Sequence, residues 1–301
     1  MSNEPRSGSV TLAEIASQPE CWERAIGLAR AGTSGLPGKG ERVLVLGCGT
    51  SYYAALAYAS LREAAGHGET DALVASELPG RLRSYDRVVA ISRSGTSTDL
   101  LDAVHRIEGT PITAVLGEQD SPLAGLAADV VDLSFADEES VVQTRFPTTF
   151  LLLARAYHAD QDSAAVAGLP DAARSALEGP LPATGIDQLV VLGHDWAVGV
   201  AHEAALKVRE SAGAWAESYP VAEYRHGPIS VAGPGTLVWA LAPLDADLVD
   251  AIVATGAKVE QGQGDPLVEL VRIHRFAVAL AEQVGRDADT PTHLTRSVVL
   301  G

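Results

Sequence analysis

The sequence predicts an α/β fold built from two doubly wound parallel sheets, and three observations predict it. Two apolar runs without polar alternation, RVLVLG at 42–47 and QLVVLG at 188–193, are typical of parallel strands covered on both faces. Each run leads through a short loop into a segment with helical periodicity. The similarity of RVLVLGCGTS to QLVVLGHDWA suggests that one α/β unit occurs twice in the chain.

The first half of the chain alternates between helix and strand. We expect one helix over 9–31, in which Thr11 is the N-cap and Glu14 completes a capping box. A loop rich in glycine and proline follows this helix. Beyond the loop, strands are expected at 42–47, 72–75, 86–91, 111–116 and 130–133, and helices at 52–66, 98–107 and 148–160.

The alternation pauses over 162–187, which is rich in Ala, Pro, Gly and Asp and is predicted to be a partly helical linker. It resumes with strands at 188–193 and 236–243, and with helices at about 198–213, 245–256 and 267–285. We therefore expect five parts: an N-terminal helical segment (1–31), a first domain (32–161), the linker (162–187), a second domain (188–286) and a C-terminal tail (287–301).

The chain is acidic, with 22 Lys and Arg residues against 39 Asp and Glu residues and a net charge of −17. This is the wrong sign for binding nucleic acid or an anionic membrane surface, so a site for an anionic substrate must be built locally. Two cysteines, Cys21 and Cys48, make no disulfide framework and favour a reducing compartment. The first residues contain no apolar signal core, and no apolar run reaches the ~18 residues of a membrane span. We therefore expect a cytoplasmic protein without a membrane anchor.

Two loops rich in hydroxyl groups follow predicted strands, namely Gly49-Thr50-Ser51 and Ser92-Arg93-Ser94-Gly95-Thr96-Ser97. Ligands of doubly wound sheets bind at this carboxyl edge, where a loop that turns into a helix presents backbone N–H groups to a phosphate. The same residue types also make ordinary turns and N-caps. Two such loops in one domain favour an anion site, although neither is a Walker A or a GxGxxG motif.

The segment AHEAALKVRES at 201–211 places Glu203, Lys207 and Glu210 on one helical face. A surface stripe of ion pairs has the same pattern, but this helix directly follows a strand of the buried type, so its start should face the carboxyl edge. Downstream, His226 lies in a His-Gly-Pro turn, where it is either functional or an exposed loop histidine. Neither HxxxH nor CxxC is present, so we expect no metal site and no cofactor.

Five stretches of the chain are together similar to the sugar isomerase (SIS) domain family in its tandem form. They are GCGTS at 47–51, ISRSGTSTD at 91–99, EAALKVRE at 203–210, AESYPVAEYRHGP at 216–228 and HLTRSV at 293–298. Within the family, the chain resembles the isomerase half of glucosamine-6-phosphate synthase, whose sister enzymes are amino-sugar-phosphate deaminases and ketose/aldose isomerases. The resemblance covers about residues 42–301 and implies two flavodoxin-like SIS domains.

The resemblance implies a role for each matching position. The phosphate-holding positions are Ser51, Ser92, Arg93, Ser94 and Ser97, the positions that contact the sugar are Thr50 and Gln143, and Gly49 and Arg296 complete the implied substrate-binding set. Glu210 matches the general base, Lys207 a lysine beside it, and His226 a histidine that assists ring opening from a neighbouring subunit. The resemblance therefore implies a homodimer whose subunits share their sites.

These residue types suit aldose–ketose interconversion, in which one base moves a proton between C1 and C2. A carboxylate near a cation can act as that base. Lys207, one helical turn before Glu210, can stabilise charge on the enediolate oxygen, and His226 can move protons at the ring oxygen. The phosphate supplies binding energy remote from the reacting carbons.

The sequence departs from the synthase in several ways. No N-terminal cysteine nucleophile is present, so amination driven by glutamine is not expected. Arg296 stands where the synthase has its Schiff-base lysine, and arginine cannot form an imine. The segment between about 256 and 267 is short, so we expect the second domain to lack a strand and a helix. The stretch VVQTRF places Gln143 and Arg145 by the sugar.

We therefore expect a phosphosugar aldose–ketose isomerase of the amino-sugar 6-phosphate deaminase/isomerase kind, which acts on a hexose 6-phosphate or an amino-sugar 6-phosphate. Two alternatives stay open. One is a non-catalytic phosphosugar-binding sensor, which would not need the Glu210–His226 pair. The other is an ammonia-dependent enzyme that aminates a ketose phosphate, which is the reverse of the deaminase reaction.

Overall fold

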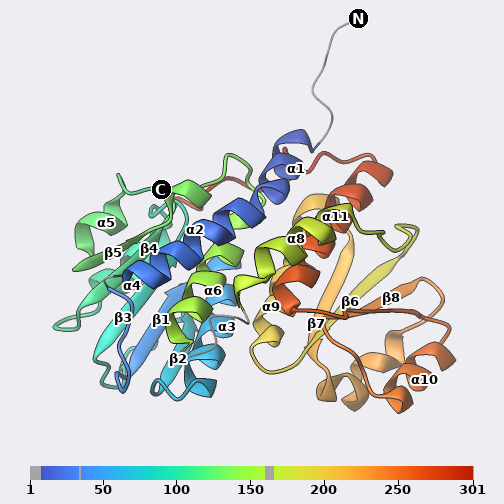
Figure 1. Cartoon of the computed structure of the whole chain (residues 1–301), viewed down its shortest axis with the longest axis horizontal. Coiled ribbons are helices and arrows are strands. Elements are labelled where there is room, and N and C mark those ends of the chain that lie inside the picture. Colours follow the sequence, from blue (N-terminus) through green and yellow to red (C-terminus); the bar gives the residue numbers. More distant parts are fainter. Residues whose placement is uncertain (1–7, 34, 160–165, 301) are drawn as a thin grey trace, which may run out of the picture. The chain divides into compact units, whose positions relative to one another are not determined.

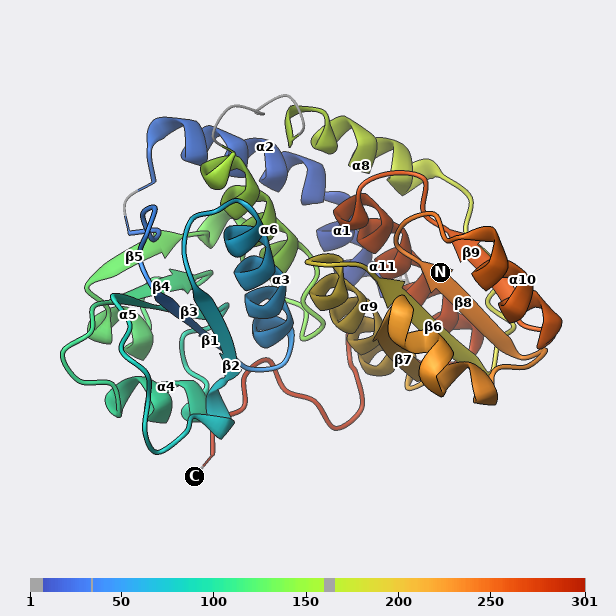
Figure 2. The same cartoon turned by 90° about the horizontal axis from the view of Figure 1, so that it is seen from below.

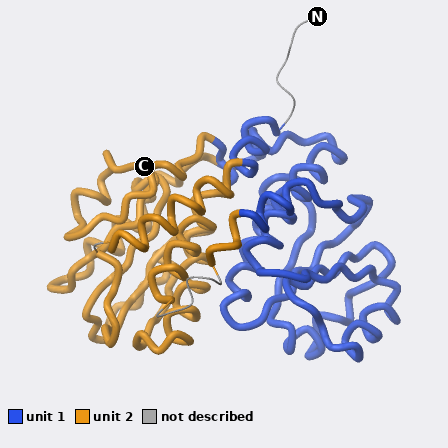
Figure 3. The backbone as a smooth tube through the Cα atoms, viewed as in Figure 1, with its two compact units in different colours: residues 1–16, 140–142, 171–294 blue, residues 17–139, 143–170, 295–301 orange. Residues whose placement is uncertain are grey.

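The computed structural model of the protein describes residues 8–33, 35–159 and 166–300. Two compact units divide the chain, as Figure 3 shows. Unit 1 comprises residues 1–16, 140–142 and 171–294, and unit 2 comprises residues 17–139, 143–170 and 295–301. Each unit is thus assembled from segments far apart in the sequence, and the expected N-terminal segment 1–31 is divided between them.

Unit 2 contains a parallel sheet of five strands: β1 (Val43–Gly47), β2 (Thr70–Val74), β3 (Arg87–Ser92), β4 (Ile112–Leu116) and β5 (Asp129–Asp132). Their order, β2-β1-β3-β4-β5, is that of a flavodoxin-like doubly wound sheet. In register, Val43 of β1 pairs with Thr70 on one side and with Arg87 on the other. Every residue of β1 and β4 is buried, as expected of strands covered on both faces.

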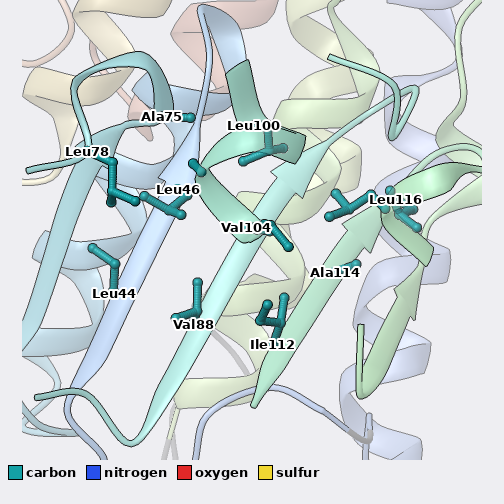
Figure 4. Packing of buried hydrophobic residues seen from close by; sticks show 13 residues of the cluster. Leu44, Leu46, Ala75, Leu78, Val88, Leu100, Val104, Ile112, Ala114 and Leu116 are labelled. Atoms are coloured by element: carbon teal, nitrogen blue, oxygen red, sulfur yellow. The ribbon is translucent and has the colours of Figure 1, made fainter. Parts of the chain in front are cut away.

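Helices cover both faces of this sheet. They are α2 (Gln18–Ala31), α3 (Thr50–Ala64), α4 (Thr98–His105), α5 (Pro122–Leu126) and α6 (Arg145–His158), with the 3₁₀ turns η1 (Ala75–Glu77) and η2 (Ser134–Ala136). On one face, Leu44, Leu46 and Val88 pack with Leu100 and Val104 of α4 (Figure 4). The opposite face is covered by α3 and α6, and α2 packs on α6 (Figure 2).

Unit 1 contains a parallel sheet of four strands within the described residues: β6 (Gln188–Gly193), β7 (Trp215–Pro220), β8 (Thr236–Ala240) and β9 (Lys258–Gln261). Its helices include α1 (Ser9–Ala16), α8 (Leu169–Glu178), α9 (Ala197–Ala212), α10 (Ala246–Ala254) and α11 (Pro266–Gln283) (Figure 1). The 3₁₀ turns η3 (Ala222–His226) and η4 (Pro228–Val231) follow β7. Val190 and Leu192 pack with Leu248 and Ile252 of α10, while α9 packs against β6 and α11. The order β7-β6-β8-β9 repeats that of the first four strands of unit 2.

The prediction of two doubly wound parallel sheets is confirmed, but the sequence analysis missed β7 and β9. Both strands lie at an edge of the unit 1 sheet and are only partly buried. Their sequences, WAESYP and KVEQ, therefore carry polar side chains instead of the continuous apolar run that identified the central strands.

The expected single helix over 9–31 is wrong, because α1 and α2 are separate helices and Pro19 lies in the first turn of α2. Proline lacks an amide hydrogen and cannot continue a preceding helix, but it fits a helix start. Thr11 is not the N-cap either. Asp289 accepts hydrogen bonds from the amides of Val10 at 3.0 Å and Thr11 at 2.8 Å, so a residue far along the chain caps α1.

The first prediction concerns Gly47, which ends β1 directly before α3. A Cβ at this residue would lie 2.5 Å from the carbonyl carbon of Ser51, so Gly47→Ala forces the backbone apart. We expect the substitution to lower the free energy of unfolding by about 2–4 kcal/mol, measured by urea denaturation. Gly27→Ala is the control: Gly27 is exposed inside α2 with nothing near its Cβ position, and alanine should stabilise the helix by about 0.5–1 kcal/mol. Equal effects at the two positions would contradict the close approach at Gly47.

Candidate functional site

The anion loop, defined as residues 92–97, connects β3 to α4 at the carboxyl edge of the unit 2 sheet. Ser92, Arg93 and Ser94 are buried in it. Gly95 has a φ of 64°, which favours glycine, and its amide donates to Ser92 Oγ at 3.0 Å. The predicted phosphate positions on this loop are therefore held in a tightly closed turn.

A second loop connects the neighbouring strand β1 to α3, so both hydroxyl-rich loops lie at one edge of the same sheet. Gly49 is the N-cap of α3 with a φ of 53°, and Thr50 and Ser51 are buried in the first turn. Among the described residues, neither Ser51 nor Ser97 uses its hydroxyl in a hydrogen bond, and Ser97 makes no side-chain capping bond to α4. These two hydroxyls are available to a ligand, which favours an anion site over a purely capping role.

The expected C-terminal tail (287–301) is divided between the units, and its part from residue 295 on, from here called the tail, belongs to unit 2 and lies on the anion loop. The guanidinium of Arg93 donates to the backbone carbonyl of Arg296 at 2.6 Å. The hydroxyl oxygen of Ser297 lies 3.2 Å from Ser94 Oγ and 2.8 Å from Thr96 Oγ1. The tail thus forms part of the surroundings of the predicted phosphate positions.

Arg296, which the resemblance places in the substrate-binding set, is held by acidic side chains within unit 2. Its guanidinium donates to both carboxylate oxygens of Asp137 at 2.9 Å, to the carboxylate of Glu118, and to the backbone carbonyl of Glu138 at 3.0 and 3.1 Å. Burial lowers the pKa of Arg296, but Glu118 and Asp137 outweigh burial and raise the pKa above its ordinary value. In this arrangement the side chain fastens the tail to unit 2.

Glu138, which the sequence analysis did not single out, is fully buried and caps α6. Its carboxylate accepts hydrogen bonds from the amides of Thr144 at 2.6 Å, Arg145 at 2.9 Å and Phe146 at 3.2 Å. The acidic run 137–139 does not adjoin the helix predicted at 148–160, and Glu138 becomes a cap because α6 begins earlier, at Arg145. Gln143, at the start of the same segment, has a buried side-chain oxygen without a hydrogen-bond partner among the described residues, a group that a sugar hydroxyl can satisfy.

In unit 1, α9 carries the predicted catalytic face. Lys207 Nζ lies 2.5 Å from Glu210 Oε2 and 3.4 Å from Glu203 Oε1. The side chain of Lys207 is 1% exposed and that of Glu203 is 4% exposed, whereas that of Glu210 is 19% exposed. This burial excludes a surface stripe of ion pairs, and it leaves Glu210 as the member of the group that a ligand can reach.

His274 of α11 is a further polar residue beside this group, and the sequence analysis missed it. Burial and, second, the positive charge of Lys207 lower the pKa of His274 to about 3, so its imidazole is neutral near pH 7. In the sequence, His274 shares a helical face with Leu270 and Ala277, which marks it as buried but does not show what it packs against.

His226 ends η3 and is exposed on unit 1. Tyr224 in the same turn is buried, and burial followed by the charge of Glu217 raises the pKa of Tyr224 to about 12. Among the described residues, His226 makes no interaction with Glu210 or Lys207. The structure therefore brings Lys207 together with its two carboxylates, but it leaves His226 at the surface.

Within the described residues, no group of three or more His, Cys, Asp or Glu side chains could hold a metal ion. In the same residues, no helix combines the length and the apolar character that crossing a bilayer requires. Two cavities of unit 2, of about 400 and 540 Å³, contain none of the predicted site residues.

No protein-family model matches this sequence. The chain is 32% identical over 274 residues to glutamine–fructose-6-phosphate aminotransferase (isomerizing) of Aeropyrum pernix, a match that covers 78% of this chain and 43% of that protein. The chain spans about half the length of the curated relatives it matches.

Solved structures share the fold over nearly the whole chain. Glucosamine-6-phosphate deaminase from Thermotoga maritima matches with a TM-score of 0.81 at 25% identity, over 97% of this chain and 100% of that chain. The C-terminal domain of glucosamine-fructose-6-phosphate aminotransferase from Francisella tularensis matches with a TM-score of 0.80 at 20% identity, over 94% and 98%. The relatives are thus named for fructose 6-phosphate and glucosamine 6-phosphate, in agreement with the resemblance carried by the five sequence stretches.

The second prediction follows from the low pKa of His274. Between about pH 6.5 and pH 3, the unfolded chain binds a proton at this residue that the folded protein does not bind, so His274 makes stability fall as the pH falls through this window. We expect His274→Gln to flatten the pH dependence of the unfolding free energy by up to about 1.4 kcal/mol per pH unit, measured by urea denaturation from pH 7 to pH 4. His105→Gln, at an exposed position of α4, should leave the slope unchanged. An unaltered slope in the His274 variant would contradict a neutral buried imidazole.

Proposed function

We propose that this protein is a phosphosugar aldose–ketose isomerase that acts on an amino-sugar 6-phosphate and moves a proton between C1 and C2. The observation that carries the proposal is the contact at 2.5 Å between the buried Lys207 and the partly exposed Glu210 on α9, in a fold shared with glucosamine-6-phosphate deaminase. A purely structural ion pair would not need one carboxylate to remain partly exposed, as Glu210 does.

The geometry around Lys207 supports Glu210 as the base. When Glu210 takes the proton from the sugar, its negative charge disappears, but Glu203 still lies 3.4 Å from the Lys207 ammonium. The buried cation therefore keeps a counter-charge at each stage of the proton transfer. Lys207 can then stabilise the oxyanion of the enediol intermediate without a large electrostatic rearrangement.

Hydrogen-bond donors in unit 2 support binding of the phosphate. The hydroxyls of Ser51 and Ser97 are unused among the described residues, and the buried Arg93 adds a positive charge to the anion loop. Binding of the phosphate would hold C1 and C2 in place for the base.

Ammonia release needs no lysine imine in this proposal. Arg296 cannot form an imine, and its guanidinium is bound by Asp137 and Glu118. Proton transfer from C2 to C1 converts the amino aldose into an imine at C2, and water then adds to C2. The C–N bond breaks, ammonia leaves and the ketose 6-phosphate remains.

The third prediction tests the base. We expect the wild-type protein to introduce solvent deuterium at C1 or C2 of glucosamine 6-phosphate, galactosamine 6-phosphate or fructose 6-phosphate. Proton NMR in D2O measures this exchange. Glu210→Gln should lower the exchange rate by about 10²–10⁴-fold and leave phosphosugar binding nearly intact, because only the proton acceptor is lost. Glu223→Gln, at an exposed position of η3, is the matched control and should exchange at the wild-type rate. Binding without exchange in the wild type would instead favour a non-catalytic sensor.

The fourth prediction tests a homodimer with shared sites, in which the exposed His226 would assist ring opening in the site of the partner subunit. We expect His226→Asn to slow isomerisation, because it removes the group proposed to assist ring opening. When Glu210→Gln and His226→Asn subunits are mixed after mild unfolding, each mixed dimer regains one intact site if the two residues come from different subunits. Random pairing then restores about a quarter of the wild-type sites. No recovery of activity in the mixture would place both residues in the same subunit.

A further inference from the structure

The hydroxyl of Ser297 makes a contact with the anion loop that the proposed function does not use. Its oxygen accepts hydrogen bonds from Ser94 Oγ at 3.2 Å and from Thr96 Oγ1 at 2.8 Å. A serine hydroxyl has two lone pairs and one proton. Thr96 Oγ1 also donates to Ser94 Oγ at 3.0 Å, so its one proton is shared between the two serine oxygens. In this cluster of three hydroxyls, the proton of Ser297 has no acceptor among the described residues.

We propose that Ser297 is a further phosphate-binding residue, brought to the anion loop by the C-terminal tail, and that Arg296 is a positioning residue that fastens the tail there. The proposal rests on the proposed function for the nature of the ligand, a phosphate group. In it, Ser297 donates its hydroxyl proton to a phosphate oxygen beside the predicted ligand Ser94.

The backbone on both sides of Ser297 is fixed by hydrogen bonds within unit 2. Before it, Arg93 donates to the carbonyl of Arg296 at 2.6 Å. After it, the amide of Thr98 donates to the carbonyl of Val298 at 3.1 Å, and the amide of Leu300 donates to Thr98 Oγ1 at 2.9 Å. A hydroxyl that is already held in place binds a ligand with little further loss of conformational entropy.

The charges around Arg296 indicate that its role differs from that of Ser297. The positive charge of Arg296 is balanced by Asp137 and Glu118, so turning its guanidinium toward a phosphate would leave two carboxylates beside an anion. We therefore expect Arg296 to affect phosphate binding indirectly, by holding the tail in place, and not by contacting the phosphate. The three nitrogens of the guanidinium serve different partners: Nη2 donates to Asp137, Nη1 to Glu118 and Nε to the carbonyl of Glu138. This spread of donors suits arginine better than lysine, which presents a single point charge.

The fifth prediction is tested by calorimetric titration of the full chain with inorganic phosphate and with fructose 6-phosphate. Ser297→Ala should raise both dissociation constants about tenfold, because a hydrogen bond to a charged group is lost. Ser297→Thr keeps the hydroxyl and should stay within about twofold of the wild type. Val299→Ala, at an exposed position of the same tail, is the matched control and should bind like the wild type.

Arg296→Gln separates positioning from direct contact. We expect it to raise the dissociation constant for inorganic phosphate in the wild-type background but to add little in the Ser297→Ala background, since both changes remove the same contact. Equal effects of Arg296→Gln in the two backgrounds would overturn the positioning role. Circular dichroism of each variant verifies that the fold is retained.

The outcomes distinguish this inference from the proposed function. If the wild type binds both ligands and Ser297→Ala binds them equally well, the role of Ser297 is overturned and the proposed function stands. If Ser297→Ala binds inorganic phosphate more tightly, the tail occupies the anion loop instead of completing it, which also overturns the role. If the wild type binds neither inorganic phosphate nor fructose 6-phosphate, both the inference and the proposed function fail.

Discussion

Both units depend on one close approach, in which the chain turns from a buried parallel strand into a helix over a few residues. A Cβ at Gly47 would lie 2.5 Å from the backbone of Ser51, and a Cβ at Gly193 would lie 2.3 Å from the carbonyl oxygen of Ala197. Only glycine permits these turns, because any side chain would overlap the first turn of the helix. The turns place the starts of α3 and α9 against the ends of β1 and β6. The hydroxyls of the second loop and the helical face with Lys207 take their positions from these two contacts.

The excess of acidic residues in the chain matters locally around Lys207 and around Arg296. With a net charge of −17, the protein has carboxylates in excess, and some of them pair with two cations of the predicted site. Lys207 has Glu203 and Glu210 as partners, and Arg296 has Asp137 and Glu118. Removal of one partner from a buried pair costs about 3–5 kcal/mol, a magnitude that applies to Lys207 and Glu203, which are 1% and 4% exposed. The pairs of Arg296 are about one third exposed and are held more weakly. Carboxylates beside a phosphate would repel it, so uncharged hydroxyl donors suit the proposed phosphate site: Ser97 on the anion loop, Ser51 on the second loop and Ser297 in the tail.

The sequence analysis predicted those features that depend only on residues close together in the sequence. Central strands such as 188–193 are continuous apolar runs, and the face of α9 follows from helical spacing alone. The edge strands β7 and β9 have no such run because one side of each is partly exposed. His274, Asp289 and Glu118 were missed for a different reason, since each acts on a residue far away in the sequence. Helical periodicity shows which face of α11 is buried, but not that Lys207 lies beside it.

Arg296, at the position where the resemblance implies a Schiff-base lysine, also constrains the proposed chemistry. A Schiff-base lysine must be able to lose its proton and attack a carbonyl, whereas a guanidinium stays protonated and is not a nucleophile. Here the guanidinium is further committed to Asp137, Glu118 and the carbonyl of Glu138. Lys207 is the lysine of the candidate catalytic group, but it is 1% exposed and lies between two carboxylates that favour its charged form. Covalent capture of an open-chain ketose by Lys207 would have to break its buried ion pair with Glu203. An isomerase on this scaffold therefore has to open the ring and move its protons by acid–base chemistry alone, with water as the nucleophile if ammonia is released.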